Sequence, residues 1–284
     1  MLRLTTASQM HLKNQIGYEY EALKLLEPTG RTPKALYADG TKTVLPYGFL
    51  VMEYLPGRPL DYHADMKAAA AVLADIHNLE VDGEATHLLC PTNPLLAILE
   101  ESRAMFAVYR DAACATGETT AGIRRLIARG EALADGKCDY GERCIVNTEL
   151  NSGNFLINEE TRHNYLVDWE KPIYAYPQQD LGHFLAPTTT FWKTDVILTQ
   201  EAILSFLHSY SELSARQRDP VRLYETVRPY LMMTCLRGVT WCSMAYVQYQ
   251  DTGKTIRNED TYRKIESYLE PGFLDMLLTD YLGE

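Results

Sequence analysis

Residues 144–158 read Cys-Ile-Val-Asn-Thr-Glu-Leu-Asn-Ser-Gly-Asn-Phe-Leu-Ile-Asn, and residues 165–170 read Tyr-Leu-Val-Asp-Trp-Glu. Short apolar runs in these two stretches are separated by polar turns, a pattern that predicts small strands. The runs cover residues 144–146, 154–157 and 165–167. Glu149, Asn154 and Asp168 follow or separate these runs, so the two carboxylates and the amide could converge on one pocket. Oxygen ligands of this kind suit Mg²⁺.

The first 60 residues carry strand and turn signals. Apolar residues at helical spacing predict a helix over residues 17–26, which ends near Pro28. Around this helix we expect three strands, over residues 2–5, 34–38 and 47–55. The start of the chain is therefore expected to form a β-rich lobe of mixed structure.

A helical pattern begins after Asp65, which we interpret as the N-cap of a helix that ends at His77. Further helices are predicted over residues 94–115, 121–134, 200–213, 220–250 and 260–282. His77 and His183 lie on apolar faces and are interpreted as packing residues rather than metal ligands. The expected fold class is α+β, with a small β-rich lobe and a large, mainly α-helical lobe.

The composition limits the class of protein. The chain has 284 residues, 46% of them hydrophobic, and 27 Lys plus Arg against 38 Asp plus Glu give a net charge of −11. This charge is a poor match for a polyanion, so neither nucleic acid nor anionic membrane is expected as a partner. No stretch is apolar enough to span a membrane and the start lacks a secretory signal, so we expect a cytoplasmic protein.

The cysteines show no Cys-x-x-Cys pair, and we expect free thiols that serve packing in a reducing compartment. They are Cys90, Cys114, Cys138, Cys144, Cys235 and Cys242. Four aromatic residues of the helical part, Trp192, Trp241, Tyr246 and Tyr249, are interpreted as core residues. The alternative interpretation is a cage for a cationic or planar acceptor.

The quoted stretch resembles the aminoglycoside phosphotransferase and choline kinase family, relatives of the protein kinases whose catalytic loop has the general form His-Gly-Asp-x-x-x-x-Asn. Residues 147–154 take the place of this catalytic loop, and residues 166–170 take the place of the metal-binding segment. The resemblance implies that Glu149 accepts the proton of a substrate hydroxyl, while Asn154 and Asp168 hold Mg²⁺ on the phosphates of ATP. It also implies a protein-kinase-like bilobal fold.

The resemblance extends toward the start of the chain. Glu19 resembles the helix glutamate that pairs with a strand cation near the nucleotide phosphates, and Arg3 is the candidate cation. A Met-Glu-Tyr-Leu-Pro-Gly sequence resembles the hinge between the lobes, whose backbone would meet adenine. The hinge residues assigned to this contact are Glu53, Tyr54 and Leu55. Asp180 resembles a family aspartate that supports the catalytic loop, and Asn147 is assigned a supporting role with it.

Three departures from the family pattern are expected to matter. Asn147 takes the place of the loop histidine, and Glu149 takes the place of the catalytic aspartate with a side chain one CH₂ longer. Because the chain begins at the strand with Arg3, we expect a truncated N-lobe and hinge over 1–57, without the first strands and the phosphate-covering loop, and a C-lobe over 58–284. Positional errors near 1 Å can cost about 10²-fold in rate, so activity could be weak or absent.

The residues leave more than one function open. The leading hypothesis is an ATP-dependent phosphotransferase acting on a small hydroxyl compound, such as an aminoglycoside, choline or a sugar. The alternative is a catalytically impaired pseudokinase that binds a nucleotide or small molecule without turnover. A third possibility is a shortened version of an ordinary kinase whose product starts upstream. The simplest interpretation of Glu149, Asn154 and Asp168 is a polar turn between strands. The sequence makes no prediction of an oligomeric state.

Overall fold

A computed structural model describes residues 1–5, 10, 12–82, 86–136, 139–216, 219–250 and 258–281. The chain forms two compact units, and each unit is assembled from three segments that are distant in the sequence. The first unit comprises Met1–Pro91, Tyr140–Asp180 and Leu198–Tyr224, and the second comprises Thr92–Asp139, Leu181–Ile197 and Glu225–Glu284. The division at residue 57 into an N-lobe and a C-lobe stays a prediction.

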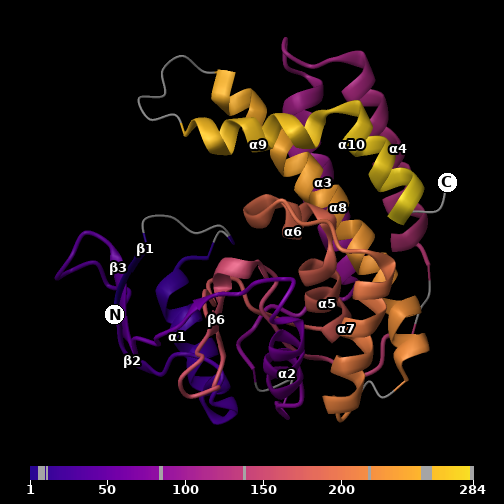
Figure 1. Ribbon diagram of the computed structural model, residues 1–284. Helices are drawn as coiled ribbons and strands as arrows, with labels where there is room; N and C mark the ends of the chain where they lie inside the picture. Colours follow the sequence, from indigo (N-terminus) through magenta and orange to yellow (C-terminus); the bar gives the residue numbers. More distant parts are fainter. Residues whose placement is uncertain are drawn as a thin grey trace. The chain divides into compact units, whose positions relative to one another are not determined.

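Three antiparallel strands near the start of the chain form a sheet in the order β1-β3-β2. They are β1 (Leu2–Thr5), β2 (Ala35–Asp39) and β3 (Gly48–Met52). Helix α1 (Gln15–Leu26), followed by the 3₁₀ turn η1 (Glu27–Thr29), packs against β2 and β3 (Figure 1). The predicted strands are confirmed, but β3 ends at Met52, short of the predicted residue 55, although the next residue still donates its N–H to the Lys34 carbonyl.

Two smaller groups of strands flank the 147–154 loop. β5 (Cys144–Val146) pairs with β8 (Ile173–Ala175), and β6 (Phe155–Ile157) lies between β4 (Arg58–Pro59) and β7 (Tyr165–Leu166). The three strands predicted in this stretch are confirmed, except that Asn154 belongs to the 3₁₀ turn η2 (Ser152–Asn154). The sequence interpretation missed β4, an Arg-Pro pair without an apolar run, and β8, an Ile-Tyr-Ala run that the same pattern could have indicated.

Two helices of the first unit, α2 (Met66–His77) and α7 (Gln200–Leu213), pack against each other. Asp65 precedes α2 as predicted, but its side chain makes no capping hydrogen bond. Its carboxylate accepts hydrogen bonds from Arg58 and from the backbone N–H of Asp61 instead. The predicted cap is therefore wrong in its contact, because a charged donor competes strongly for a carboxylate.

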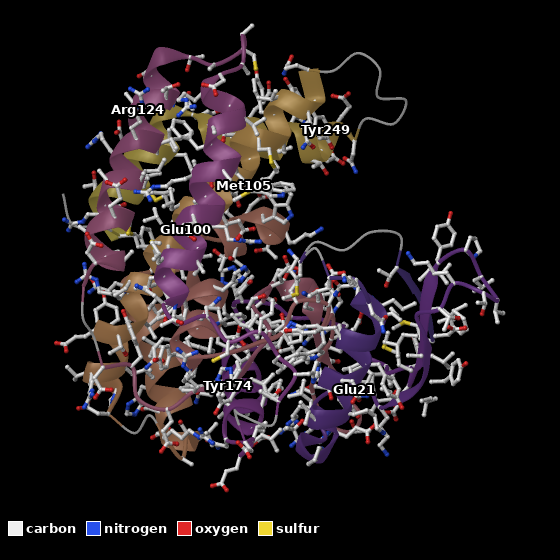
Figure 2. The ribbon with its side chains drawn as sticks, turned by 180° about the vertical axis from the view of Figure 1, so that it is seen from behind. Glu21, Glu100, Met105, Arg124, Tyr174 and Tyr249 are labelled. Carbon is white, nitrogen blue, oxygen red and sulfur yellow. The ribbon has the colours of Figure 1, made fainter. Side chains whose placement is uncertain are left out.

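Helices make up the second unit. They are α3 (Pro94–Arg110), α4 (Gly117–Ala134), α6 (Pro187–Thr194), α9 (Glu259–Leu269), α10 (Pro271–Met276) and the π-helical turn η3 (Leu277–Tyr281). Two helices, α5 (Pro177–Leu185) and α8 (Pro220–Gln250), begin in the first unit and continue in the second. On α3, Met105 is buried and Glu100 is exposed, as expected of an amphipathic helix (Figure 2).

The helix predicted over residues 260–282 is divided in the structure. Pro271 lacks an N–H and its ring clashes with the preceding turn, so α9 ends at Leu269 and α10 begins at Pro271. Leu282 lies outside the described residues. The helix predicted over 94–115 also ends early, at Arg110. Among the described helices, none combines the length and the apolar character that crossing a membrane requires.

The described cysteines are free thiols. Cys144, Cys235 and Cys242 are buried, as expected of packing residues, whereas Cys90 is exposed. Burial raises the pKa of the Cys235 thiol to about 12, which keeps this thiol protonated at neutral pH. Cys138 lies outside the described residues.

Candidate active site

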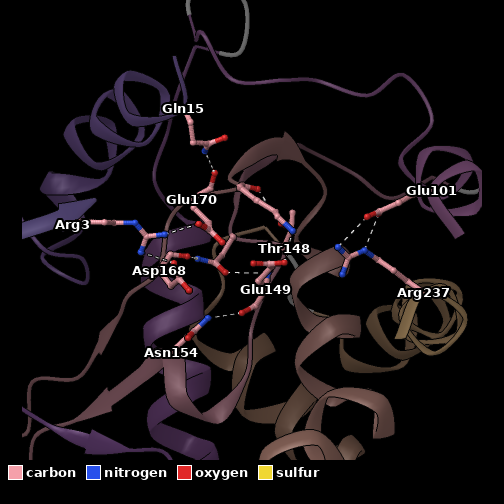
Figure 3. Close-up of polar contacts among 11 residues, drawn as sticks. Arg3, Gln15, Glu101, Thr148, Glu149, Asn154, Asp168, Glu170 and Arg237 are labelled. Carbon is pink, nitrogen blue, oxygen red and sulfur yellow. Dashed lines mark hydrogen bonds and ion pairs between the residues drawn. The ribbon is translucent and has the colours of Figure 1, made fainter. Parts of the chain in front are cut away.

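The guanidinium of Arg3, on β1, lies among three carboxylates of the first unit. Its Nε is 3.1 Å from Oε2 of Glu19, its Nη1 donates to Oδ1 of Asp168 at 2.9 Å, and its Nη2 donates to Oε2 of Glu170 at 2.6 Å. Figure 3 draws the contacts with Asp168 and Glu170. One side chain can serve three partners because the planar guanidinium carries five N–H groups. The structure therefore contains the ion pair expected between Arg3 and Glu19, and adds Glu170 to it.

Burial and neighbouring charges shift the pKa values of the groups around Arg3. Glu19 is only 1% exposed, and this burial raises the pKa of its carboxyl from the ordinary 4.5 to about 7, against the opposing effect of Arg3. The pKa of the Glu170 carboxyl is also raised, by burial and by the neighbouring Asp168. Burial lowers the pKa of Arg3, but the three carboxylates outweigh it and the pKa rises overall. Three carboxyl groups thus surround one guanidinium, and burial is the main cause of the raised pKa values of Glu19 and Glu170.

Asp180, on α5, supports the start of the 147–154 loop. Its buried carboxylate accepts hydrogen bonds from the backbone N–H groups of Asn147 and Thr148, both at 2.8 Å. Nε2 of His77 lies 3.2 Å from the same carboxylate, and Nδ1 of His77 lies 2.9 Å from the hydroxyl of Tyr210. The packing role expected for His77 is therefore more specific: it connects Asp180 to the core between α2 and α7.

Glu149 is held by contacts at its side chain and its backbone. Nζ of Lys171 donates to Oε1 of Glu149 at 2.6 Å, and Nδ2 of Asn154 donates to the Glu149 carbonyl at 2.7 Å. The Glu149 N–H in turn donates to Oδ1 of Asn147 at 3.1 Å, while Nδ2 of Asn147 donates to the Asp168 carbonyl at 2.9 Å. Asn147 therefore joins the loop to the segment 166–170.

Two residues of this site have left-handed backbones that favour glycine. The φ angle is 72° at Thr148 and 64° at Asp168. A non-glycine residue in this region carries a cost on the order of 1–2 kcal/mol, most for a β-branched side chain such as threonine. The hydrogen bonds of the Thr148 N–H to Asp180 and of its hydroxyl to the Lys171 carbonyl hold the strained geometry in place.

A cavity of about 230 Å³ joins the charged cluster to an apolar wall. Arg3, Glu19, Asn154 and Asp168 line its polar part. The remaining lining consists of Met1, Leu23, Pro33, Met52, Val167 and Trp169. The cavity is smaller than the roughly 300 Å³ at which ordinary ligand pockets begin.

The apolar wall was missed by the sequence interpretation, although one signal was present. Leu23 follows Glu19 by four residues on α1, a spacing that places both side chains on one helix face. Trp169 is almost fully buried, and its indole N–H donates to the Leu166 carbonyl at 2.9 Å. Met52 directly precedes the hinge residues assigned from the sequence.

The assigned hinge residues themselves are not part of the described cavity lining. The Glu53 N–H donates to the Lys34 carbonyl at 2.9 Å, and the Glu53 carboxylate accepts from the Lys34 N–H at 3.3 Å. Tyr54 is 75% exposed, whereas Leu55 is buried. A contact between these residues and adenine stays a prediction.

The side-chain oxygen atoms of this site suit Mg²⁺, which completes its coordination with phosphate and water, better than they suit a metal coordinated by side chains alone. Asp168 offers a carboxylate, and Asn154 uses its amide nitrogen on Glu149, so its carbonyl oxygen is the atom suited to a metal. Within the described ranges, no three His, Cys, Asp or Glu residues are arranged to hold a metal ion. Mg²⁺ commonly binds one or two protein oxygens and completes its shell with phosphate and water, which fits this arrangement.

The aromatic residues considered for an acceptor cage pack against one another within the second unit. The rings of Trp192 and Trp241 meet edge to face with centroids 5.4 Å apart. Tyr246 and Tyr249 both stack on Tyr262, at 5.9 Å and 5.5 Å. Such pairing is typical of packed helices. Trp241 is exposed, however, and Trp192, Tyr246 and Tyr249 are only half-buried, so the structure does not confirm the core interpretation of these residues.

Comparison with known proteins places the chain among related sequences. The sequence model described as the phosphotransferase enzyme family matches residues 2–230, a range that includes Arg3, Glu19, Glu149, Asn154, Asp168 and Asp180. A search of curated proteins gave no significant match.

Several solved structures have a similar fold. A spectinomycin phosphotransferase, solved with ADP and spectinomycin, is 14% identical over 98% of this chain and 84% of its own, with a TM-score of 0.63. The ethanolamine kinase of Plasmodium vivax is 13% identical over 96% and 76%, with a TM-score of 0.66. The choline kinase of Streptococcus pneumoniae is 18% identical over 95% and 84%, with a TM-score of 0.60. The predicted kinase-like α+β fold is therefore confirmed.

Proposed function

Since the chain belongs to the phosphotransferase enzyme family, we propose that it transfers the γ-phosphate of ATP to a hydroxyl group of a small molecule. The observation that carries this proposal is the cavity where Arg3, Asn154 and Asp168 meet beside an apolar wall. Such a cavity offers a flat apolar surface to a base and charged groups to phosphates. The solved spectinomycin phosphotransferase contains ADP, which supports a nucleotide as the donor.

In this proposal, the polar end of the cavity receives the phosphates. Arg3, oriented by Glu19, donates to phosphate oxygens, and Asp168 and Asn154 hold Mg²⁺. When bound, the metal neutralises charge on the transferred phosphoryl group. Because Arg3 already contacts Asp168 and Glu170, nucleotide binding redistributes its hydrogen bonds among more acceptors.

Glu149 supplies the base for the acceptor. The acceptor oxygen forms a bond to the γ-phosphorus as the bond from this phosphorus to the β–γ bridging oxygen breaks, and ADP leaves. The hydroxyl proton passes to the Glu149 carboxylate. The acceptor is a small hydroxyl compound, since the similar solved proteins are phosphotransferases and kinases of spectinomycin, ethanolamine and choline.

A second candidate function, nucleotide binding without turnover, is favoured by one observation. Arg3 and Lys171 each contact a carboxylate that the reaction requires, Asp168 and Glu149, at 2.9 Å and 2.6 Å. If these contacts persist with a nucleotide bound, they compete with the metal for Oδ1 of Asp168 and with the acceptor for Oε1 of Glu149. Binding and turnover therefore have to be measured separately.

A thermal-shift titration tests the proposal. ATP and Mg²⁺ are added alone and together, because a ligand that binds only the folded state stabilises it by RT ln(1 + [L]/Kd). We expect a shift that needs both, that disappears in Asp168→Ala and that survives in Asp111→Ala, which alters an exposed carboxylate. ADP release with spectinomycin, ethanolamine or choline then measures turnover. Binding without turnover would support the second candidate, and no shift at millimolar ATP would contradict both.

A further inference from the structure

We infer that Lys171 is a positioning residue for Glu149, an inference that rests on the proposed function. Nζ of Lys171 donates to Oε1 of Glu149 at 2.6 Å, and the two side chains are only 13% and 25% exposed. An ion pair shielded from water in this way holds its geometry better than a pair on the open surface.

The length of the Glu149 side chain makes such an anchor necessary. Glutamate has one more rotatable bond than the aspartate of the related loop motif, so its carboxylate can occupy more positions. A displacement near 1 Å of a reacting group can cost about 10²-fold in rate. A carboxylate held by Lys171 keeps a defined orientation, to which an acceptor hydroxyl can be aligned.

The backbone of Lys171 is itself fixed to the loop. The hydroxyl of Thr148, the residue before Glu149, donates to the Lys171 carbonyl at 2.9 Å. At the other end of the segment, Nδ2 of Asn147 donates to the Asp168 carbonyl at 2.9 Å. Residues 168–171 and the loop are therefore joined at two points, which fixes the distance that the Lys171 side chain has to span.

The two cations of the site divide the carboxylates between them. Arg3 contacts Glu19, Asp168 and Glu170, whereas Lys171 contacts Glu149. Figure 3 labels Arg3, Glu149, Asp168 and Glu170. Lys171 immediately follows Glu170 in the chain but contacts a different acid. This division assigns Arg3 to the phosphate and metal side of the site and Lys171 to the acceptor side.

The inference and the hypothesis of an impaired loop predict opposite changes of turnover in the Glu149→Asp variant. Glu149→Asp withdraws the carboxylate by about one bond length, roughly 1.5 Å, beyond hydrogen-bond reach of Lys171. If Lys171 positions Glu149, this substitution lowers turnover. If glutamate were merely a defect in the loop, the same substitution would raise turnover.

The experiment compares kcat and KM for MgATP, with spectinomycin, ethanolamine, choline and water as separate acceptors. The variants are Lys171→Met, Lys171→Arg and Glu149→Asp, and the control is Lys67→Met, which removes an exposed charge on α2. We expect kcat to fall on the order of 10²-fold in Lys171→Met, with KM for MgATP unchanged. Lys171→Arg should recover part of the loss because it retains the charge, and Lys67→Met should match the wild type.

The outcomes separate this inference from the proposed function. Equal kcat in Lys171→Met and the wild type would overturn the positioning role while leaving the phosphotransferase intact. A rise of kcat in Glu149→Asp would overturn it as well. No turnover of the wild type with any acceptor would overturn the proposed function, and the role of Lys171 with it. If Lys171→Met fails to fold, as judged by circular dichroism, Lys171→Arg is measured in its place. A lower kcat with an unchanged KM for MgATP supports the positioning role, and an unchanged kcat contradicts it.

Discussion

Nη1 of Arg3 donates to Oδ1 of Asp168 at 2.9 Å, a contact between residues 165 positions apart in the sequence. The cation assigned to the phosphates thus already holds the carboxylate assigned to the metal. The contact keeps Asp168 oriented toward the cavity while its backbone remains in the left-handed region, at φ 64°. Under the proposed function, Arg3 consequently has two tasks, to orient Asp168 and to contact the nucleotide.

Removing Arg3 should weaken nucleotide binding. Charge-assisted hydrogen bonds contribute about 1.5–3 kcal/mol, so we expect Arg3→Met to raise the Kd of MgATP on the order of 10- to 100-fold, as measured by calorimetric titration. Arg3→Lys should recover only part of the affinity, because an ammonium cannot contact three carboxylates with the geometry of a guanidinium. An unchanged Kd in Arg3→Met would limit Arg3 to a structural role.

The pH dependence of stability should contain a contribution from Glu19. Its carboxyl has a pKa of about 7 when folded and an ordinary value of 4.5, so the folded state binds more protons than the unfolded state between these values. Stability therefore falls as pH rises from about 4.5 to about 7 and is then constant, by a total on the order of 3 kcal/mol. Glu19→Gln should lack this fall.

Urea unfolding at pH 5, 6, 7 and 8 measures the effect of Glu19. The wild type and Glu19→Gln should diverge with rising pH, while Glu21→Gln, which alters an exposed carboxylate on the same helix (Figure 2), should follow the wild type. Parallel curves for the wild type and Glu19→Gln would show that Glu19 ionises as easily in the folded chain as in the unfolded one.

Replacing Asp180 should destabilise the loop from beneath. In Asp180→Asn, the NH₂ of the new side chain cannot accept a hydrogen bond and would face a backbone donor, so either Asn147 or Thr148 loses its acceptor. A buried donor without an acceptor costs about 1–3 kcal/mol, and the loss of a charged acceptor adds to it. We expect a stability loss of about 2–4 kcal/mol in urea unfolding, against almost none for the exposed Asp111→Asn. A loss below 1 kcal/mol would contradict this role of Asp180.

A glycine in the second unit offers a test of its packing. A Cβ at Gly182 would lie 2.6 Å from the Leu231 backbone nitrogen and 2.7 Å from Cβ of Tyr230. Gly182→Ala should therefore cost about 2–3 kcal/mol through overpacking. Gly117→Ala, where a Cβ meets no described atom within 4 Å, should be neutral or slightly stabilising. Equal melting temperatures of the two variants would contradict the close approach at Gly182.

The long elements were predictable because their patterns extend over many residues. Helices α7 and α8 have the bounds that periodicity predicts, even though Pro229 lies inside α8. The short helices α5 and α6 were missed, because eight or nine residues hardly establish a period. Their first residues, Pro177 and Pro187, were the available signal, since proline favours the first turn of a helix.

The site was predictable only in part. The family motif indicated Arg3, Glu19, Asn154 and Asp168, and these four residues line one cavity. The contact of Lys171 with Glu149 could not be predicted, because the residues are 22 positions apart and no periodic pattern relates them. The apolar wall depends in the same way on how β3, α1 and the segment after β7 pack together. Tertiary contacts of this kind leave no local trace in a sequence.

The position of Trp169 gives the cavity its own optical signal. This indole is one of three in the chain, it is almost fully buried, and it lines the cavity beside Asp168, its neighbour in the sequence. The other two, Trp192 and Trp241, contact each other in the second unit. In a chain with both of these replaced by phenylalanine, the remaining tryptophan fluorescence comes from the cavity wall. Its emission would then follow the arrival of a nucleotide directly, without any attached dye.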